Sequence, residues 1–246
     1  MSSVAEPVSI VAGYQFVDVQ DGPALRERCL SSARDAGIKG TLLIAPEGIN
    51  FTLAGSGAAI AGWLQALRSD PRFAAIEVKQ HQAGALPFAR LRVKLKSEII
   101  RMNQPGVRPG AGRAPVVAPA TLARWLEHGH DDQGRPVVVL DTRNGFEVDA
   151  GAFVGALDWR LQKFSDFPAA LQANVAQLQG KTVVSYCTGG IRCEKAALWM
   201  QQQGLNNVLQ LEGGILRYFE ALPHAPHWQG SCFVFDEREQ IEPPAR

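Results

Sequence analysis

The chain has 246 residues, 46% of them hydrophobic, and a formal net charge of +1, so it can build one large or two small domains with real cores. Its four cysteines show no regular spacing, which excludes a disulfide framework and favours a reducing compartment. No run of about 18 apolar residues and no signal-like N-terminus occurs, which predicts a soluble, cytoplasmic protein without a membrane partner. HExxH, paired CxxC, P-loop and GxGxxG motifs are missing, so we predict no metal site and no evident cofactor.

Hydrophobic periodicity in the first 102 residues predicts a small domain of strands and helices. Strands are expected at 8–19, 38–45, 49–53, 76–80 and 91–95, and helices at 23–36 and 58–67. Pro23 suits a first helical turn, Gly37 suits a helix stop, and residues 46–48 suit a hairpin turn. The resulting order βαββαβ is that of a ferredoxin-like α+β sandwich, which we assign to residues 1–102.

The last strand predicted in this domain alternates cations with apolar residues. Its charged face and the segment after it carry seven basic residues: Arg90, Arg92, Lys94, Lys96, Arg101, Arg108 and Arg113. Glu98 is the only acidic residue between them, so a nearly neutral protein has one local basic stripe. Such a stripe fits a phosphate backbone, although a solvated sheet face or a lysine-guarded edge strand would have the same pattern.

Residues 103–118 are rich in proline, glycine and arginine and have no apolar period. This composition predicts a linker between two domains. An alternative is an extended arm whose arginines reach the phosphates of a nucleic acid.

Residues 119–228 alternate predicted helices and strands, a pattern typical of an α/β domain with a parallel sheet. A helix is expected from Pro119, a strand at 137–140, a helix at 169–178 and a strand at 182–186. Asp141 and Arg143 follow the first strand, at the sheet edge where open α/β folds place their sites, so they are candidate supporting residues. A purely structural pair between Arg143 and Glu147 is the alternative. Residues 229–246 are expected to form an apolar tail packed on this domain.

The strand at 182–186 leads into Cys187, a glycine-containing loop and a helix. Backbone N–H groups at a helix N-terminus favour anions, and Gly189 and Gly190 allow the loop amides to converge on one point. With Arg192 folding back, we expect the Cys187 thiol to be exposed and its pKa to lie below the free value of about 8.5. The residues predicted to cradle the negative sulfur are Thr188, Gly189, Gly190, Ile191 and Arg192.

The cysteines of this segment also admit plain structural interpretations. Cys187 could be a small buried hydrophobe in a turn, although the neighbouring glycines and arginine favour a reactive thiol. Cys193, one helical turn later, is either a resolving thiol for Cys187 or a packed core residue, and packing is favoured. Glu194 and Lys195 are either exposed first-turn helix residues or catalytic ones.

The six-residue loop from Cys187 to Arg192, the strand motif at 137–143 and the turn at 211–215 resemble rhodanese-like domains, in which a loop cysteine becomes a persulfide. Across the whole chain, the segments 40–50, 90–96, 141–144, 187–195 and 232–238 resemble the bacterial tRNA uridine hydroxylases. Longer members of that family continue past the last of these segments into a cysteine-rich tail, whereas this sequence ends at Arg246.

The resemblance implies oxygen-dependent conversion of the wobble uridine of tRNA to 5-hydroxyuridine, with Cys187 as a persulfide-type active-site cysteine. It further implies the tRNA anticodon loop as partner, no DNA, and molecular oxygen as co-substrate with an unidentified electron donor. As a hypothesis, the sulfur supplies the reducing equivalents or passes through an oxidised state. The basic stripe would hold phosphates, and the unpaired uridine could enter a pocket without breaking a duplex.

Two other classes of function remain open at this point. A generic persulfide-carrying sulfurtransferase would form thiocyanate from cyanide and would not need the basic face at 90–96. A non-enzymatic module that binds RNA or protein would not need Cys187, and the intact loop argues against it.

Overall fold

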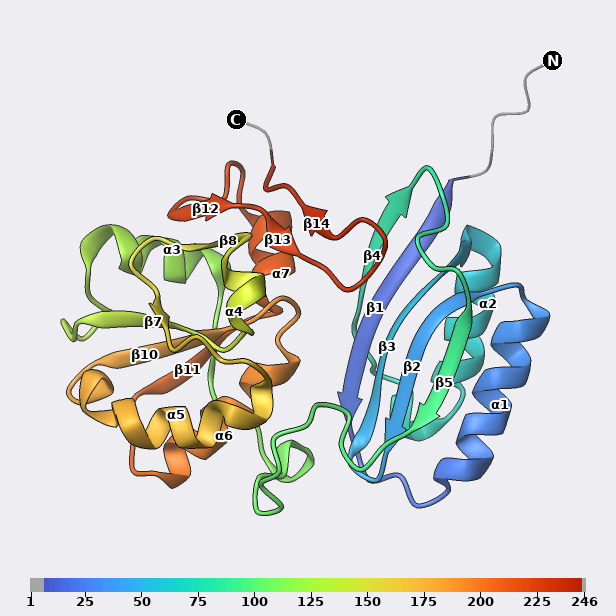
Figure 1. Ribbon diagram of the computed structural model, residues 1–246, viewed down its shortest axis with the longest axis horizontal. Helices are drawn as coiled ribbons and strands as arrows, with labels where there is room; N and C mark the ends of the chain where they lie inside the picture. The colour runs from blue at the N-terminus through green and yellow to red at the C-terminus, as the bar shows by residue number, and fades with distance from the viewer. Residues whose placement is uncertain (1–6, 245–246) are drawn as a thin grey trace. The chain divides into compact units, whose positions relative to one another are not determined.

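The computed structural model describes residues 7–244, so the first six residues of the predicted N-terminal domain and the last two of the predicted tail lie outside it. The chain divides into two compact units, with the division between Ile99 and Ile100 (Figure 1). Each unit has its own hydrophobic core. Within the described residues, no helix is both long enough and apolar enough to cross a membrane.

The first unit contains every element that the hydrophobic pattern predicts. Its strands are β1 (Val8–Phe16), β2 (Lys39–Ala45), β3 (Gly48–Ser56), β4 (Val78–Ala83) and β5 (Leu91–Leu95). Its helices are α1 (Gly22–Asp35), α2 (Gly57–Arg68) and the short 3-10 helix η1 (Pro71–Phe73). The Ser56 hydroxyl caps α2 by accepting a hydrogen bond from the Ala59 amide, because the first N–H groups of a helix lack partners within it.

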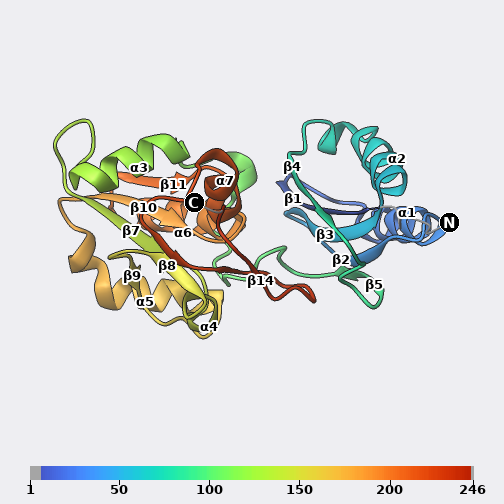
Figure 2. The same cartoon turned by 90° about the horizontal axis from the view of Figure 1, so that it is seen from above.

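The strands of the first unit form one sheet in the order β4-β1-β3-β2-β5. Four of them have the arrangement expected of a ferredoxin-like sandwich, and β5 adds a fifth strand that pairs parallel to β2, with Val93 opposite Leu42. Helices α1 and α2 lie on one face of the sheet, where Leu25, Trp63 and Phe51 are among the core side chains (Figure 2). The basic strand β5 is therefore an edge strand.

The second unit is an α/β domain, as predicted. Its strands are β6 (Val116–Val117), β7 (Val137–Asp141), β8 (Gly151–Phe153), β9 (Leu157–Asp158), β10 (Thr182–Tyr186), β11 (Val208–Leu211), β12 (Trp228–Gly230), β13 (Cys232–Phe233) and β14 (Gln240–Ile241). Its helices are α3 (Pro119–His128), α4 (Gly145–Val148), α5 (Phe167–Asn174), α6 (Ile191–Gln202) and α7 (Gly214–Ala221), with 3-10 turns η2 (Pro109–Ala111), η3 (Phe164–Asp166) and η4 (Val175–Leu178).

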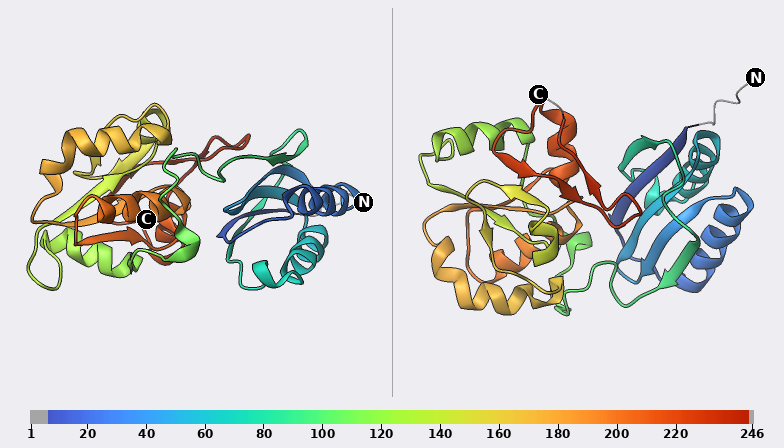
Figure 3. Two further views of the ribbon diagram at one scale, coloured as in Figure 1. Left: turned by 90° about the horizontal axis from the view of Figure 1, so that it is seen from below. Right: turned by 45° about the horizontal axis from the view of Figure 1, so that its top comes forward.

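A parallel sheet in the order β6-β11-β10-β7-β9 forms the centre of this unit. Helices α5 and α6 cover one face, and α3 and α7 cover the other (Figure 3). Because successive strand residues face opposite sides of the sheet, the Val183 side chain packs on the face covered by α5 and α6, and the Val184 side chain packs on the face covered by α3 and α7. Strand β10 lies at the middle of the sheet and is buried on both faces.

The prediction of a linker at residues 103–118 is wrong, because these residues belong to the second unit and pack on it. Ala114 lies in the core beneath α5 and α6, and Val107 and Pro109 are also buried. Residues 116–117 form β6, which adds to the sheet beside β11. Apolar side chains at irregular spacing anchor this segment, and periodicity gives no sign of them.

The C-terminal tail is confirmed as a packed segment. Cys232 and Val234 are buried, β13 pairs with β14, and the Ser231 amide donates a hydrogen bond to the Ala150 carbonyl.

Candidate active site

Cys187 lies directly after the central strand β10 and before helix α6, at the carboxyl edge of the parallel sheet. This is the position that the sequence predicts, and it is where open α/β sheets place their sites. Gly190, the residue before the helix, has φ +99°, a left-handed conformation that glycine adopts without steric cost. The loop can therefore reverse direction within three residues.

The loop amides converge on the sulfur, as predicted. The Gly190 amide donates a hydrogen bond to Cys187 Sγ at 3.1 Å, and the Arg192 amide also contributes to the sulfur's environment. On the opposite side of the backbone, the Cys187 and Thr188 carbonyls accept hydrogen bonds of 3.0 and 3.1 Å from Ile215 and Leu216, at the start of α7. These bonds hold the first two carbonyls of the loop against α7 and so fix the backbone that leads to the Gly190 amide.

Gly214 allows the start of α7 to approach the Cys187 and Thr188 carbonyls. It was not identified from the sequence as a supporting residue. A Cβ atom at position 214 would lie 2.3 Å from the Cys187 carbonyl oxygen, and its φ of +66° is in the left-handed region. Only glycine fits there without a shift of backbone. The Gly213-Gly214 pair is visible in the sequence, but its contact with the thiol loop depends on the tertiary fold.

The charge state of Cys187 follows from several opposing influences. Burial by itself raises its pKa, but a hydrogen bond with Cys193, the positive charge of Arg192 and the amides of Arg192 and Gly190 outweigh burial. The pKa of Cys187 is therefore held well below the ordinary thiol value, as the sequence predicts.

The expectation that the thiol would be exposed is wrong, because Cys187 is 0% exposed. The tight curl that brings the Gly190 amide to the sulfur also closes the loop over it. The surroundings are nevertheless polar, with Arg192, Cys193 and backbone N–H groups next to the sulfur, so the plain apolar interpretation of Cys187 does not apply. The outer side of the loop, at Thr188, Gly189 and Ile191, is half-buried.

Arg192 is held by a carboxylate that the sequence did not assign to it. Its two terminal nitrogens donate to the Glu147 carboxylate at 2.6 and 2.8 Å, and both side chains are buried. The Thr188 hydroxyl lies 3.4 Å from the same carboxylate. A buried bidentate pair of this kind fixes the guanidinium geometrically and places a permanent positive charge beside Cys187.

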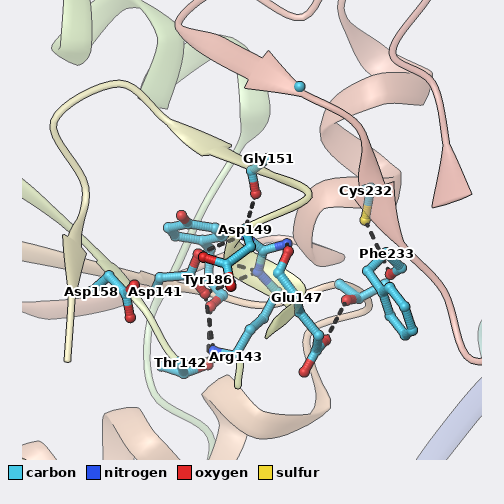
Figure 4. Close-up of polar contacts among 12 residues, drawn as sticks. Asp141, Thr142, Arg143, Glu147, Asp149, Gly151, Asp158, Tyr186, Cys232 and Phe233 are labelled. Atoms are coloured by element: carbon cyan, nitrogen blue, oxygen red, sulfur yellow. Dashed lines mark hydrogen bonds and ion pairs between the residues drawn. The ribbon is translucent and has the colours of Figure 1, made fainter. Parts of the chain in front are cut away.

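The structural alternative for Arg143 and Glu147 is confirmed in part, because Arg143 Nη1 donates to the Glu147 backbone carbonyl at 3.2 Å, whereas the Glu147 carboxylate binds Arg192. Arg143 instead pairs with Asp141, with Nη2 2.6 Å from Oδ2, and also donates to the Gly151 carbonyl at 2.6 Å (Figure 4). Its guanidinium lies 5.5 Å from the centre of the Tyr186 ring. Glu147 is forty-five residues from Arg192 in the chain, so no local pattern could have linked them.

Cys193 is a packed residue that also contacts the reactive thiol. It is fully buried, and the Thr142 hydroxyl lies 3.6 Å from its Sγ atom. Burial together with the hydrogen bond to Cys187 raises the pKa of Cys193 well above the ordinary value. Its burial and its contact with Thr142 agree with the favoured packed role, and the resolving role stays a prediction.

Glu194 and Lys195 are buried, so the interpretation as exposed helix residues is wrong. Lys195 Nζ donates to the Ile100 carbonyl at 3.0 Å, and Glu194 forms an ion pair of 2.8 Å with Arg113 Nε. Both contacts anchor residues 100–118 to α6.

The basic residues predicted to bind phosphates are exposed, and they fall in two settings. Four lie on or beside the edge strand β5 of the first unit: Arg90, Arg92, Lys94 and Lys96. None of these four forms an ion pair with another residue in the range 7–244. Arg101, Arg108 and Arg113 are exposed in the second unit, where Arg113 is partly neutralised by Glu194.

Comparison with known proteins agrees with this architecture. Residues 8–99 match the family model described as a UPF0176 acylphosphatase-like domain, and residues 119–221 match the model of the rhodanese-like domain. The matched rhodanese range contains the complete thiol loop and its supporting residues 141–147 and 213–216.

Full-length relatives are also similar to this chain. A protein from Bordetella avium named tRNA uridine(34) hydroxylase is 58% identical over 95% of this chain and 96% of its own length. Proteins of the same name from Variovorax paradoxus and Cupriavidus necator are 56% and 54% identical, each over 95% of this chain and over 88% and 82% of their own lengths. The chain therefore belongs to the tRNA uridine(34) hydroxylase family.

Proposed function

We propose that this protein hydroxylates uridine 34 of tRNA to 5-hydroxyuridine in the cytoplasm, with Cys187 as the reactive group. Its place among the tRNA uridine(34) hydroxylases supports the reaction. The single structural observation that supports the residue is the Gly190 amide, which donates a hydrogen bond to Cys187 Sγ at 3.1 Å at the carboxyl edge of the parallel sheet, and the lowered pKa of Cys187 agrees with it. An anion of sulfur is the nucleophilic and redox-active form of cysteine.

The reaction replaces the C5–H bond of uridine by a C5–OH bond. With molecular oxygen as co-substrate, one oxygen atom enters the base and the other leaves as water, which takes up two electrons and two protons from a reductant. We assign the entry of these electrons to the sulfur at Cys187, as the thiol or as a persulfide, which gives up two electrons to oxygen in each turnover and is reduced again by the unidentified electron donor. The loop amides and Arg192 then stabilise whichever form is negative.

We assign tRNA binding to the exposed cations of β5 and of residues 101–113. Phosphate contacts position a nucleic acid without reading its sequence, and exposed cations serve this purpose; the β5 cations serve it best, since Arg113 is already paired with Glu194. The wobble uridine is unpaired in the anticodon loop, so it can be turned toward the protein at small cost. Because Cys187 is fully covered, entry of the base requires the residues over the sulfur to move.

Replacing Cys187 by serine should abolish 5-hydroxyuridine in tRNA. The measurement is mass spectrometry of nucleosides from cells that lack the protein and receive either the wild type or the variant. Cys29→Ser is the matched control, because Cys29 is a buried cysteine of the first unit whose pKa burial raises to about 11. Full 5-hydroxyuridine with Cys187→Ser would contradict the role of the thiol.

A generic sulfurtransferase is the second candidate, and the match of residues 119–221 to the rhodanese-like domain favours it. It predicts thiocyanate from cyanide and a sulfur donor, at a rate independent of tRNA and of the β5 cations. Nucleoside composition separates the two functions, since only the first changes uridine 34.

A further inference from the structure

Three phenylalanine rings form an exposed cluster on the second unit. Phe146 of α4, Phe233 of β13 and Phe235 after it have ring centroids 5.1, 5.2 and 6.3 Å apart, in edge-to-face contacts. Phe146 is 50% exposed and Phe235 is 66% exposed, the largest exposure of any large hydrophobic side chain in the described residues. Single exposed apolar residues are ordinary, but a group of aromatic rings in the open marks an interaction surface.

Both chain segments that supply the cluster lie close to the thiol loop or to residues that support it. Phe146 precedes Glu147, whose carboxylate binds Arg192 and lies 3.4 Å from the Thr188 hydroxyl. Phe233 follows Cys232, whose thiol forms a hydrogen bond with Thr188 of the loop and feels the charge of Glu147, and α4 packs against β13. The aromatic cluster thus lies next to the segments that support the thiol loop.

The shape and charge of the cluster favour flat, unpaired bases over a folded protein. The rings stand edge to face, so Phe146 and Phe235 offer separate ring faces and not one continuous groove. Arg238 is paired with Asp236 and Arg160 with Asp149, and Glu237 and Glu239 beside Phe235 are exposed, so the cluster offers ring faces and no free cation. Stacking of bases on aromatic rings needs no local net charge and tolerates any base.

We propose that Phe146, Phe233 and Phe235 form a stacking platform for an unpaired anticodon-loop base next to uridine 34. This inference rests on the proposed function, because it takes the anticodon loop to be the RNA that reaches Cys187. The platform holds the neighbouring base and leaves the wobble uridine to enter the site. Cations elsewhere on the protein supply the phosphate contacts.

The test compares Phe146→Ala and Phe235→Ala with Val154→Ala in the full chain. Val154 is a matched control because it is 54% exposed and belongs to the same unit but not to the cluster. Fluorescence anisotropy with an anticodon stem-loop RNA should give a Kd about 10- to 100-fold higher for each phenylalanine variant, and Phe235→Trp should keep the affinity. An RNA with abasic sites on both sides of uridine 34 should bind the wild type as weakly as the normal RNA binds the variants.

The binding and 5-hydroxyuridine measurements together distinguish failure of the stacking platform from failure of the proposed function. If all variants bind the stem-loop like Val154→Ala, the platform is ruled out even when the wild type makes 5-hydroxyuridine. The same conclusion holds if binding is unchanged and 5-hydroxyuridine falls only in cells, since the rings would then contact a protein that donates sulfur or electrons. If the wild type itself makes no 5-hydroxyuridine, the proposed function fails independently of the binding data.

Discussion

The two groups of cations in this protein are built in opposite ways. On β5 of the first unit, Arg92 and Lys94 are exposed and make no ion pair with a described residue. Around Cys187 in the second unit, Arg143 and Arg192 are buried and each is paired with a carboxylate at 2.6 Å. The sequence contains all four as ordinary basic residues, so only their surroundings distinguish them.

The difference determines what each group can do. A buried charge that loses its partner cannot be solvated, so each buried arginine is fixed in one geometry and can tune a neighbouring atom. An exposed charge is screened by solvent and salt and is free to meet a new partner, so the β5 cations suit the tRNA binding proposed above. The first property suits the proposed role of Cys187, and the second suits the proposed binding of phosphates.

Glu147→Gln gives the largest expected effect, because it leaves Arg192 buried opposite a neutral amide. We expect a loss of about 3–5 kcal/mol in the free energy of unfolding, measured by urea denaturation. Asp132→Asn is the matched control, since it breaks the Arg124–Asp132 pair, in which both side chains are about half exposed, and should cost less than about 1 kcal/mol. Equal losses in the two variants would contradict the contrast between buried and exposed pairs.

The pH dependence of the unfolding free energy tests whether Cys187 is ionised in the folded protein. Its pKa is lowered on folding, so the folded protein releases this proton at a pH at which the unfolded chain still holds it. The stability that the thiolate contributes is therefore complete above the ordinary thiol pKa and is lost as the pH falls through the folded value. In that interval the difference in unfolding free energy between wild type and Cys187→Ser should grow by about 1.4 kcal/mol per pH unit.

The measurement is a series of urea denaturations between the two limits of that interval. Lys94→Gln on β5 serves as comparison and should differ from the wild type by an amount that does not change with pH. A flat difference for Cys187→Ser as well would mean that the sulfur is not ionised in the folded protein.

Neutralising β5 should have the smallest effect on stability and a clear one on RNA. For Arg92→Gln with Lys94→Gln, we expect a change of at most about 0.5 kcal/mol per substitution in the unfolding free energy. The dependence of tRNA binding on salt should weaken, with the slope of log K against log salt falling by between about 1 and 2. Arg34→Gln with Arg217→Gln, which removes two exposed helical cations, should leave the slope unchanged; an equal change would rule out β5 as the phosphate-binding strand.

Prediction from the sequence succeeded where a feature is local in the chain. The strand before Cys187, the glycine-containing loop and the helix after it follow from β-branched residues, glycines and helical periodicity within twenty residues. The alternation from Arg90 to Lys96 likewise located an exposed charged strand. It left the edge-strand and phosphate-binding interpretations open, and the edge position of β5 now makes both compatible.

Prediction failed where a contact joins distant segments. The pairing of Glu147 with Arg192, the contact of Gly214 with the loop carbonyls and the anchoring of residues 100–118 by Glu194 and Lys195 all span elements brought together only by the sheet. The exposure of Cys187 was wrong for the same reason, because accessibility depends on every segment that packs over an atom.

The sequence by itself thus determined the order of elements, the two domains and a thiol placed where strand becomes helix, because backbone preferences and hydrophobic period act over short stretches of chain. The tertiary structure alone decided that the sulfur is covered, which carboxylate holds which arginine, and that three phenylalanines from separate segments share one exposed surface. Burial and ion pairing depend on the summed neighbours of an atom, and those neighbours come from the whole fold.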